Sequence, residues 1–184
     1  MTAAGARIAG SFILTASLLG VASGAATESE YWSIDDFPSD QAPVFEDYPA
    51  RWPVPYGLFS INFDSHPDAP RFAEALEAAI GQGPNFATYY SVVEVGCGSG
   101  CATFVAADVD TGNVVIGPVA TAGFEYQALS SLLVANPPNN LAYAYPGNEI
   151  PKSVYPRYYR LTEDGFELVW CWRPDADSEG DTAC

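Results

Sequence analysis

The segment Gly96-Cys97-Gly98-Ser99-Gly100-Cys101 constrains the fold more than any other part of this chain. Its two cysteines lie four positions apart, and glycines beside and between them permit the positive φ angles of a sharp reversal. Such a reversal brings the two sulfurs to bonding distance. Apolar residues precede and follow the segment. We therefore expect a tight turn between two strands, closed by a Cys97–Cys101 disulfide.

The same segment has a competing interpretation. An apolar strand ending in Glu94 and followed by G-x-G-x-G looks like the first motif of a Rossmann-type methyltransferase. That loop needs a helix after it, because the helix N-terminus helps to bind the ligand. Here a turn signal at 110–113 follows after only nine residues. A crossover between parallel strands needs about a dozen residues or more, so we reject this interpretation.

The first 26 residues have the layout of a secretory signal peptide. Arg7 gives the N-terminal region its positive charge, residues 8–22 are apolar, and small residues follow. We therefore expect cleavage near Gly24–Ala26. The apolar part is shorter than the roughly 20 residues of a membrane span, although an uncleaved anchor stays open as an alternative. The segment predicts a periplasmic or extracellular protein with no transmembrane segment after cleavage.

The chain contains four cysteines, which suits an oxidising compartment. Four cysteines allow three pairings. If Cys97 pairs with Cys101, then Cys171 pairs with Cys184 by elimination. The second bridge would tether an acidic tail, residues 174–184, and a ring of that size stabilises the fold by roughly 3 kcal/mol.

The net charge limits the classes of partner. The whole chain carries a charge of −16, and removal of residues 1–26, which contain Arg7 and no acid, changes this to −17. Such a chain repels phosphate backbones and anionic membrane surfaces, so we expect no nucleic-acid partner. A basic protein, a cation or a neutral ligand is electrostatically suitable. Alternatively, the charge serves only solubility.

The remaining chain divides into an arm and a domain. Residues 27–56 form an extended arm rich in proline, acids and aromatics, because prolines forbid a helix or a central strand there. The aromatics of the arm predict that part of it packs along the domain. Residues 57–173 form the domain itself.

The domain pattern predicts an α+β fold, a mostly antiparallel sheet with one amphipathic helix near residues 69–80. The helix has Asp68 as its N-cap, Pro70 in its first turn and one apolar face. Residues 136–140 are expected to form a loop. Alternating or β-branched segments predict strands at 58–63, 86–95, 103–109, 114–116, 124–127, 131–135, 158–161 and 166–172.

Several ordered motifs link the chain to a known family. They are Phe45–Pro49, Ser65–Ala69, Gly83–Ala87, Gly96–Cys101 and Asp110–Val114. Together, over roughly residues 45–170, they resemble a family of small exported bacterial proteins of unknown function. The resemblance implies an exported single domain and supplies no reaction. Members usually carry Gly-His-Tyr where this chain has Thr88-Tyr89-Tyr90. The resemblance therefore does not extend to an activity that needs that histidine.

His66 is the only histidine, which leaves no Ser-His-Asp system unless His66 serves it. Its position before Pro67 and the helix cap is typical of a surface turn. A sharper hypothesis is copper(I) binding by Cys97 and Cys101 with His66 as the third ligand. Because a closed disulfide is the commoner fate of such a pair in exported proteins, we expect no metal and no cofactor.

Carboxylates and tyrosines supply the other candidates. Glu94 ends an apolar strand, and Asp108 and Asp110 lie two apart, as either loose calcium ligands or turn residues. Tyr89 and Tyr90 belong to a set of tyrosines suited to a contact surface. With Glu94 they are the binding candidates of a non-enzymatic module that contacts a basic protein. The alternatives are an exported hydrolase using Glu94 and Asp108, or a copper or thiol-redox protein.

Overall fold

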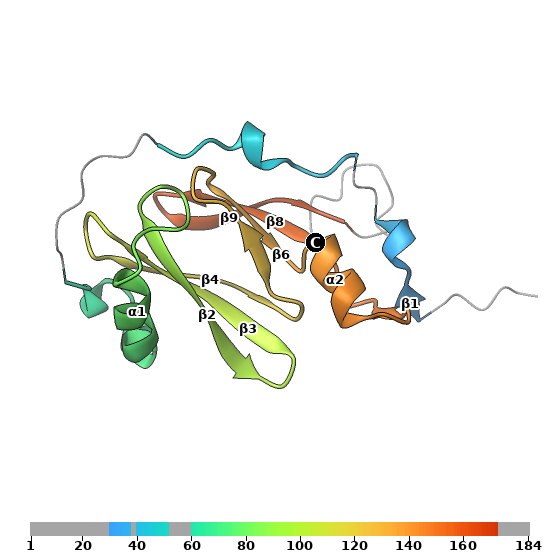
Figure 1. The fold of residues 1–184 in the computed structure, drawn as a ribbon, viewed down its shortest axis with the longest axis horizontal. Coiled ribbons are helices and arrows are strands. Elements are labelled where there is room, and N and C mark those ends of the chain that lie inside the picture. The colour runs from blue at the N-terminus through green and yellow to red at the C-terminus, as the bar shows by residue number, and fades with distance from the viewer. Residues whose placement is uncertain (1–29, 38–39, 52–59, 173–184) are drawn as a thin grey trace, which may run out of the picture.

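Two antiparallel sheets and a small strand pair make up the part of the chain that the computed structural model describes, residues 30–37, 40–51 and 60–172 (Figure 1). The predicted α+β class with mostly antiparallel strands is confirmed. The first sheet has the order β2-β3-β4, the second has the order β5-β6-β8-β9, and β1 pairs with β7. The strands are β1 (Tyr31–Trp32), β2 (Tyr90–Gly98), β3 (Cys101–Asp108), β4 (Val114–Ala120), β5 (Phe124–Tyr126), β6 (Leu132–Ala135), β7 (Ile150–Pro151), β8 (Arg157–Thr162) and β9 (Gly165–Cys171).

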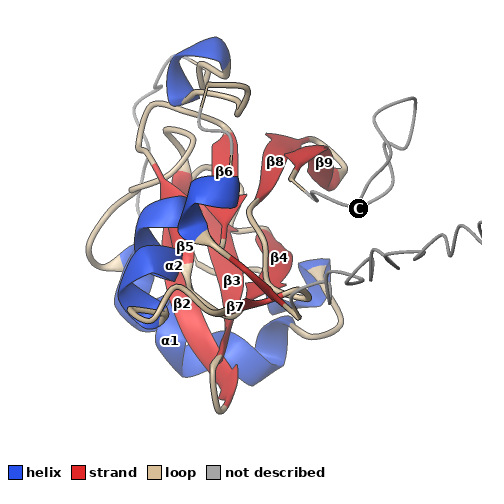
Figure 2. Cartoon of the chain, turned by 90° about the vertical axis from the view of Figure 1, so that its right-hand side faces the viewer, coloured by secondary structure: helices blue, strands red, loops and turns tan. Residues whose placement is uncertain are grey.

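The sheets form layers because residues alternate between the two faces of each strand. One face of the first sheet packs on the second sheet, and its other face packs on helix α1 (Ala73–Ile80) through Leu76 and Val105. The outer face of the second sheet is covered by the arm, where Phe45 and Tyr48 pack on Leu132. Figure 2 shows α1 and the short helix of the arm at opposite ends of this stack. Part of the arm therefore packs on the domain, as its aromatics predict.

An aromatic cluster joins the two sheets. Phe86 and Phe104 are fully buried, with ring centroids 5.4 Å apart in an edge-to-face arrangement. The Phe104 ring lies at the same 5.4 Å from Phe124, Tyr126 and Phe166, which come from β5 and β9. Each such pair contributes about 0.5–1.5 kcal/mol beyond its burial, so this cluster is the centre of the core.

The predicted helix near 69–80 is present as two parts. A 3-10 turn spans Ala69–Phe72 and continues into α1. Asp68 has the predicted N-cap position, but its side chain makes no capping hydrogen bond. A second, shorter helix, α2 (Pro138–Ala144), begins where the sequence predicts a loop. Proline is favoured in the first turn of a helix because its missing N–H has no helical partner there, so Pro138 starts α2 rather than preventing it.

Two strand predictions are too long, and the predicted strand 114–116 is too short, because β4 continues to Ala120. Strand β2 begins at Tyr90, not at 86, because Ala87 and Thr88 adopt left-handed conformations with φ of 47° and 71°. In the described part of the predicted strand 58–63, Asn62 makes only an isolated bridge to Asn113 before a 3-10 turn. These changes shorten the first sheet at the end where Tyr90 lies.

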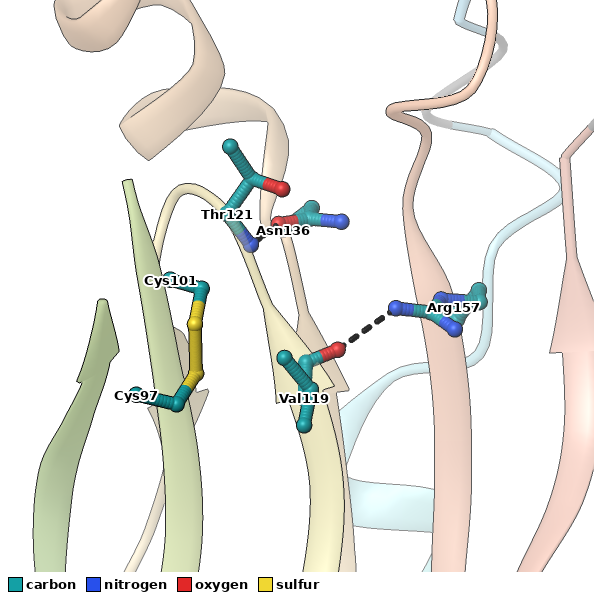
Figure 3. Close-up of a disulfide and its surroundings, with 6 residues drawn as sticks. All are labelled: Cys97, Cys101, Val119, Thr121, Asn136 and Arg157. Carbon is teal, nitrogen blue, oxygen red and sulfur yellow. Dashed lines mark hydrogen bonds between the residues drawn. A yellow bond between two sulfur atoms is a disulfide. The ribbon is translucent and has the colours of Figure 1, made fainter. Parts of the chain in front are cut away.

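Asn136 connects the end of β6 to the start of β5 and to the segment before β8. Its φ is 55°, a conformation that asparagine tolerates better than most residues. The buried side-chain oxygen accepts hydrogen bonds from the Thr121 and Ala122 amides at 2.8 and 2.9 Å (Figure 3), and the amide group donates to the Tyr155 carbonyl. Asn136 therefore supplies partners for three backbone groups.

The substitution Asn136→Ala is expected to lower the free energy of unfolding by about 3 kcal/mol. It leaves the two amides unpaired and places an alanine in a left-handed conformation. Urea denaturation measures the change. Asn139→Ala, on the exposed side of α2, is the matched control and should change stability by about 0.5 kcal/mol or less. Equal losses in the two variants would contradict the role of Asn136.

Candidate functional site

A cleft of about 660 Å³ opens where β2 begins and where β3 and β8 end. One wall holds Tyr89, Tyr90 and Asp108, and the turn after β3 adds Asp110. The opposite wall comes from the arm around Arg51 and from the turn between β8 and β9. We call it the tyrosine–aspartate cleft. It brings together the predicted tyrosine pair and the predicted aspartate pair.

Tyr90 and Asp108 are directly opposite each other in the ladder between β2 and β3, so their side chains lie on the same face. Burial raises the pKa of Tyr90, the charge of Asp108 raises it further, and Arg51 acts in the opposite direction. Tyr90 therefore keeps its phenol proton at neutral pH and offers a hydrogen-bond donor. Tyr89 reaches the same cleft because the strand begins only after it.

Asp108 fixes a turn through one of its two carboxylate oxygens. Its Oδ1 accepts hydrogen bonds from the Asp110 and Thr111 amides at 2.7 and 3.2 Å, which fixes the turn after β3. Its Oδ2 makes no hydrogen bond to the described residues. The prediction that Asp110 is a turn residue is therefore confirmed.

The loop that leads into the two tyrosines has a strained backbone. Ala87 and Thr88 have positive φ without being glycine, which costs of order 1–3 kcal/mol each. The conformation is held by bonds from the Thr88 amide to the Ala128 carbonyl at 2.7 Å and from the Thr88 hydroxyl to the Arg51 carbonyl at 2.9 Å. Strain of this kind concentrates at binding and catalytic sites.

Arg51 and Glu163 join the two parts of the opposite wall. Their side chains form an ion pair of 2.6 Å between the arm and the turn after β8. Both are about four-fifths exposed, at 78% and 85%, so the pair adds little to stability. The sequence did not indicate these two residues, because they lie 112 positions apart and neither belongs to a motif.

Glu94 lies away from the cleft. Its carboxyl group accepts a hydrogen bond from the Phe124 amide and lies against Gly123, where an added Cβ would be 3.3 Å from Oε2. Although the residue as a whole is exposed, partial burial of the carboxyl raises its pKa. Glu94 is opposite Phe104, four strand positions or about 13 Å from the Tyr90–Asp108 pair. Glu94 and Asp108 therefore do not form the close carboxylate pair of the hydrolase hypothesis.

Cys97 and Cys101 are joined in a disulfide at the far end of β3, with Cα atoms 5.4 Å apart (Figure 3). The turn lies beside the end of β4. It lines neither the tyrosine–aspartate cleft nor the two other clefts found among the described residues. Cys171, the last residue of β9, is also disulfide-bonded, whereas Cys184 lies outside the described residues, so that pairing stays a prediction.

His66 does not join the two cysteines of the copper hypothesis. It lies beside the start of β4, because the neighbouring Ser65 hydroxyl accepts a hydrogen bond from the Val114 amide at 2.8 Å. Its Nδ1 accepts a hydrogen bond from the Asp68 amide at 3.1 Å, a turn contact of the predicted kind. The three candidate ligands thus lie at opposite ends of β3.

No protein-family model, curated protein or solved structure matches this chain. In the described ranges, no helix is long and apolar enough to cross a membrane. The same ranges contain no group of three His, Cys, Asp or Glu side chains arranged to hold a metal ion. What the cleft binds must follow from its own side chains.

The raised pKa of Glu94 predicts a pH-dependent effect of Glu94→Gln. Because the folded protein holds this proton more tightly than the unfolded chain, its ionisation lowers stability as pH rises through the raised pKa. The stability of the variant relative to the parent should therefore rise between about pH 4 and pH 7. Urea denaturation at both pH values measures this, with Glu77→Gln on α1 as the control for loss of one carboxylate. An unchanged difference would contradict the prediction.

Replacing Cys97 and Cys101 together by serine tests the separation of the disulfide from the cleft. Opening so short a ring costs about 2 kcal/mol in the chain-entropy model. The cleft lies about 23 Å away along β3, so the amide resonances of Tyr90 and Asp108 should not move. Denaturation and a two-dimensional NMR spectrum give both results. A shift of those resonances would show that the disulfide shapes the cleft.

Proposed function

We propose that this protein is an exported, non-enzymatic binding module that holds a positively charged group of a partner protein in the tyrosine–aspartate cleft. The observation that carries the proposal is the grouping of Asp108 and Asp110 with two tyrosines in one cleft, where Arg51, the one cation among the described lining residues, is paired with Glu163. Carboxylates attract a cation, and an aromatic ring face adds about 0.5–1 kcal/mol at an exposed site.

The composition of the whole chain supports a basic partner. A net charge of −16 accelerates association with positively charged molecules and disfavours nucleic acid and anionic membranes. A cleft of this size accepts a lysine or arginine side chain together with its flanking backbone. The basic segment of an envelope or extracellular protein fits these properties.

Export and family membership are parts of the same proposal. The disulfide between Cys97 and Cys101 is consistent with an oxidising compartment. The signal-peptide pattern falls on residues outside the described ranges. We therefore propose a periplasmic or extracellular location and membership of the family of small exported proteins that the ordered motifs resemble.

The hydrolase alternative receives less support. Its two carboxylates, Glu94 and Asp108, lie at different places, and glycoside hydrolysis needs carboxyl groups about 5–9.5 Å apart across a substrate. Asp108 also uses one oxygen to fix a turn, which suits a positioned binding group. Binding is therefore the function that the cleft supports best.

An NMR titration that measures the binding of N-acetyl-lysine methylamide tests the proposal. The resonances of Tyr89, Tyr90 and Asp108 should shift, and the affinity should fall as salt screens the charges. Asp108→Asn keeps the turn acceptor but removes the charge, so it should weaken binding about fivefold, equivalent to about 1 kcal/mol. Asp35→Asn, an exposed aspartate near the other end of the second sheet, is the matched control.

Two results would refute the proposal. One is equal binding of the uncharged norleucine analogue, which would show that charge does not select the ligand. The other is an equal effect of Asp108→Asn and Asp35→Asn, which would attribute the binding to net charge rather than to the cleft.

A further inference from the structure

A second groove, of about 550 Å³, runs along strand β4. Residues 113–118 line the groove along β4. Ser65, His66 and the turn between β8 and β9 also line it. Glu163 in that turn lines both this groove and the tyrosine–aspartate cleft. The two sites are therefore neighbours around the β8–β9 turn.

Strand β4 is an edge strand, because the sheet order is β2-β3-β4. Asn113 accepts a hydrogen bond from the Asp108 amide, so its carbonyl is turned toward β3. Backbone groups alternate in direction along an antiparallel strand, which turns the amides of Val114 and Ile116 outward. The Val114 amide donates to the Ser65 hydroxyl instead of to β3, which agrees with this direction. Ile116 therefore presents its N–H and C=O to the groove.

The open edge is limited at its far end. The register between β3 and β4 shifts after the Val105–Ile116 pair, and Pro118, which has no amide hydrogen, falls within the shift. The next carbonyl, that of Val119, accepts a hydrogen bond from Arg157 at 2.7 Å (Figure 3). Proline, bulges and such contacts protect natural edges from unwanted pairing. Here the protection begins after Ile116 and leaves a short, defined segment open.

The charges of the groove indicate what occupies it. Among the described residues that line it, the ionisable groups besides Tyr159 are Glu163, Asp164 and His66, and Glu163 is paired with Arg51 of the neighbouring cleft. A second copy of this chain would bring a charge of −16 to the same place. An extended segment with lysine or arginine side chains has the complementary charge and can satisfy the backbone groups of Ile116.

We propose that the edge of β4 docks an extended, basic segment of the partner protein by strand addition. Main-chain hydrogen bonds to Ile116 fix the segment, and Asp164 contacts its cationic side chains, whereas Glu163 is already paired with Arg51. Because Glu163 lines both sites, a segment bound along β4 lies beside the tyrosine–aspartate cleft. The choice of a basic partner rests on the proposed function. The backbone contacts to Ile116 rest only on the geometry of the β4 edge.

Three heptapeptides test the strand addition. The first is acetyl-Lys-Thr-Lys-Val-Lys-Thr-Lys-amide, and the other two carry N-methyl groups on its odd or on its even amides. Only one set of peptide amides faces β4, so one methylated peptide should bind at least tenfold more weakly while the other binds like the parent. Hydrogen exchange of the Ile116 amide should slow at least tenfold with the parent peptide.

The variant Ile116→Pro removes the outward amide at an edge position, where proline is tolerated. It should weaken binding of the parent heptapeptide at least tenfold. An unfolding midpoint close to that of the parent protein establishes that the variant folds. The methylated peptides test the same hydrogen bonds without any change to the protein.

Several outcomes separate this inference from the proposed function. Equal binding of all three peptides, or shifts confined to Tyr89, Tyr90 and Asp108, would overturn strand addition and leave the cleft proposal intact. Selective loss with one methylated peptide, in a protein that does not bind N-acetyl-lysine methylamide, would support strand addition and refute the cleft. A concentration-dependent dimer that protects the Ile116 amide without peptide would identify a second copy as the occupant and overturn the inference.

Discussion

The contact between Phe86 and Phe104 determines how the rest of this chain can be arranged. Both rings are fully buried, and together they touch side chains from both sheets. Gly117 on β4 lies against the rings of Phe104 and Phe166, and a Cβ there would crowd both, at 3.0 Å from the Phe166 ring and 3.1 Å from Phe104. Phe86 precedes β2, so its burial fixes where that strand can start.

The strained loop and the cleft follow from this anchoring. Once Phe86 is in the core, the chain must reverse within a few residues, and the Phe86 and Tyr90 backbones hydrogen-bond to each other across the reversal. Ala87 and Thr88 take up the reversal at positive φ, and Tyr89 and Tyr90 emerge at the end of the sheet. Core burial thus stabilises a conformation that the loop would not adopt alone, which places two aromatic rings beside Asp108.

Local patterns predicted the elements, and long-range contacts made the site. The Cys97–Cys101 turn and the hairpin after Asp108 each depend on residue types close together in the sequence. The start of β2 was predicted wrongly because nothing local marks Ala87 as left-handed. The Arg51–Glu163 pair could not be predicted, since a surface ion pair across 112 positions has no sequence signature.

Side chains and backbone have different tasks in the two neighbouring sites. In the proposed function, charge and aromatic rings in the cleft select a cation but tolerate many geometries, because Coulomb attraction at a partly exposed site varies slowly with distance. The backbone of Ile116 selects no side chain, but its hydrogen bonds require a defined distance and direction. A basic segment that satisfies both must be extended and must carry its cation at one position relative to β4. The two proposed sites, which share Glu163, would together give more specificity than the net charge of the chain supplies by itself.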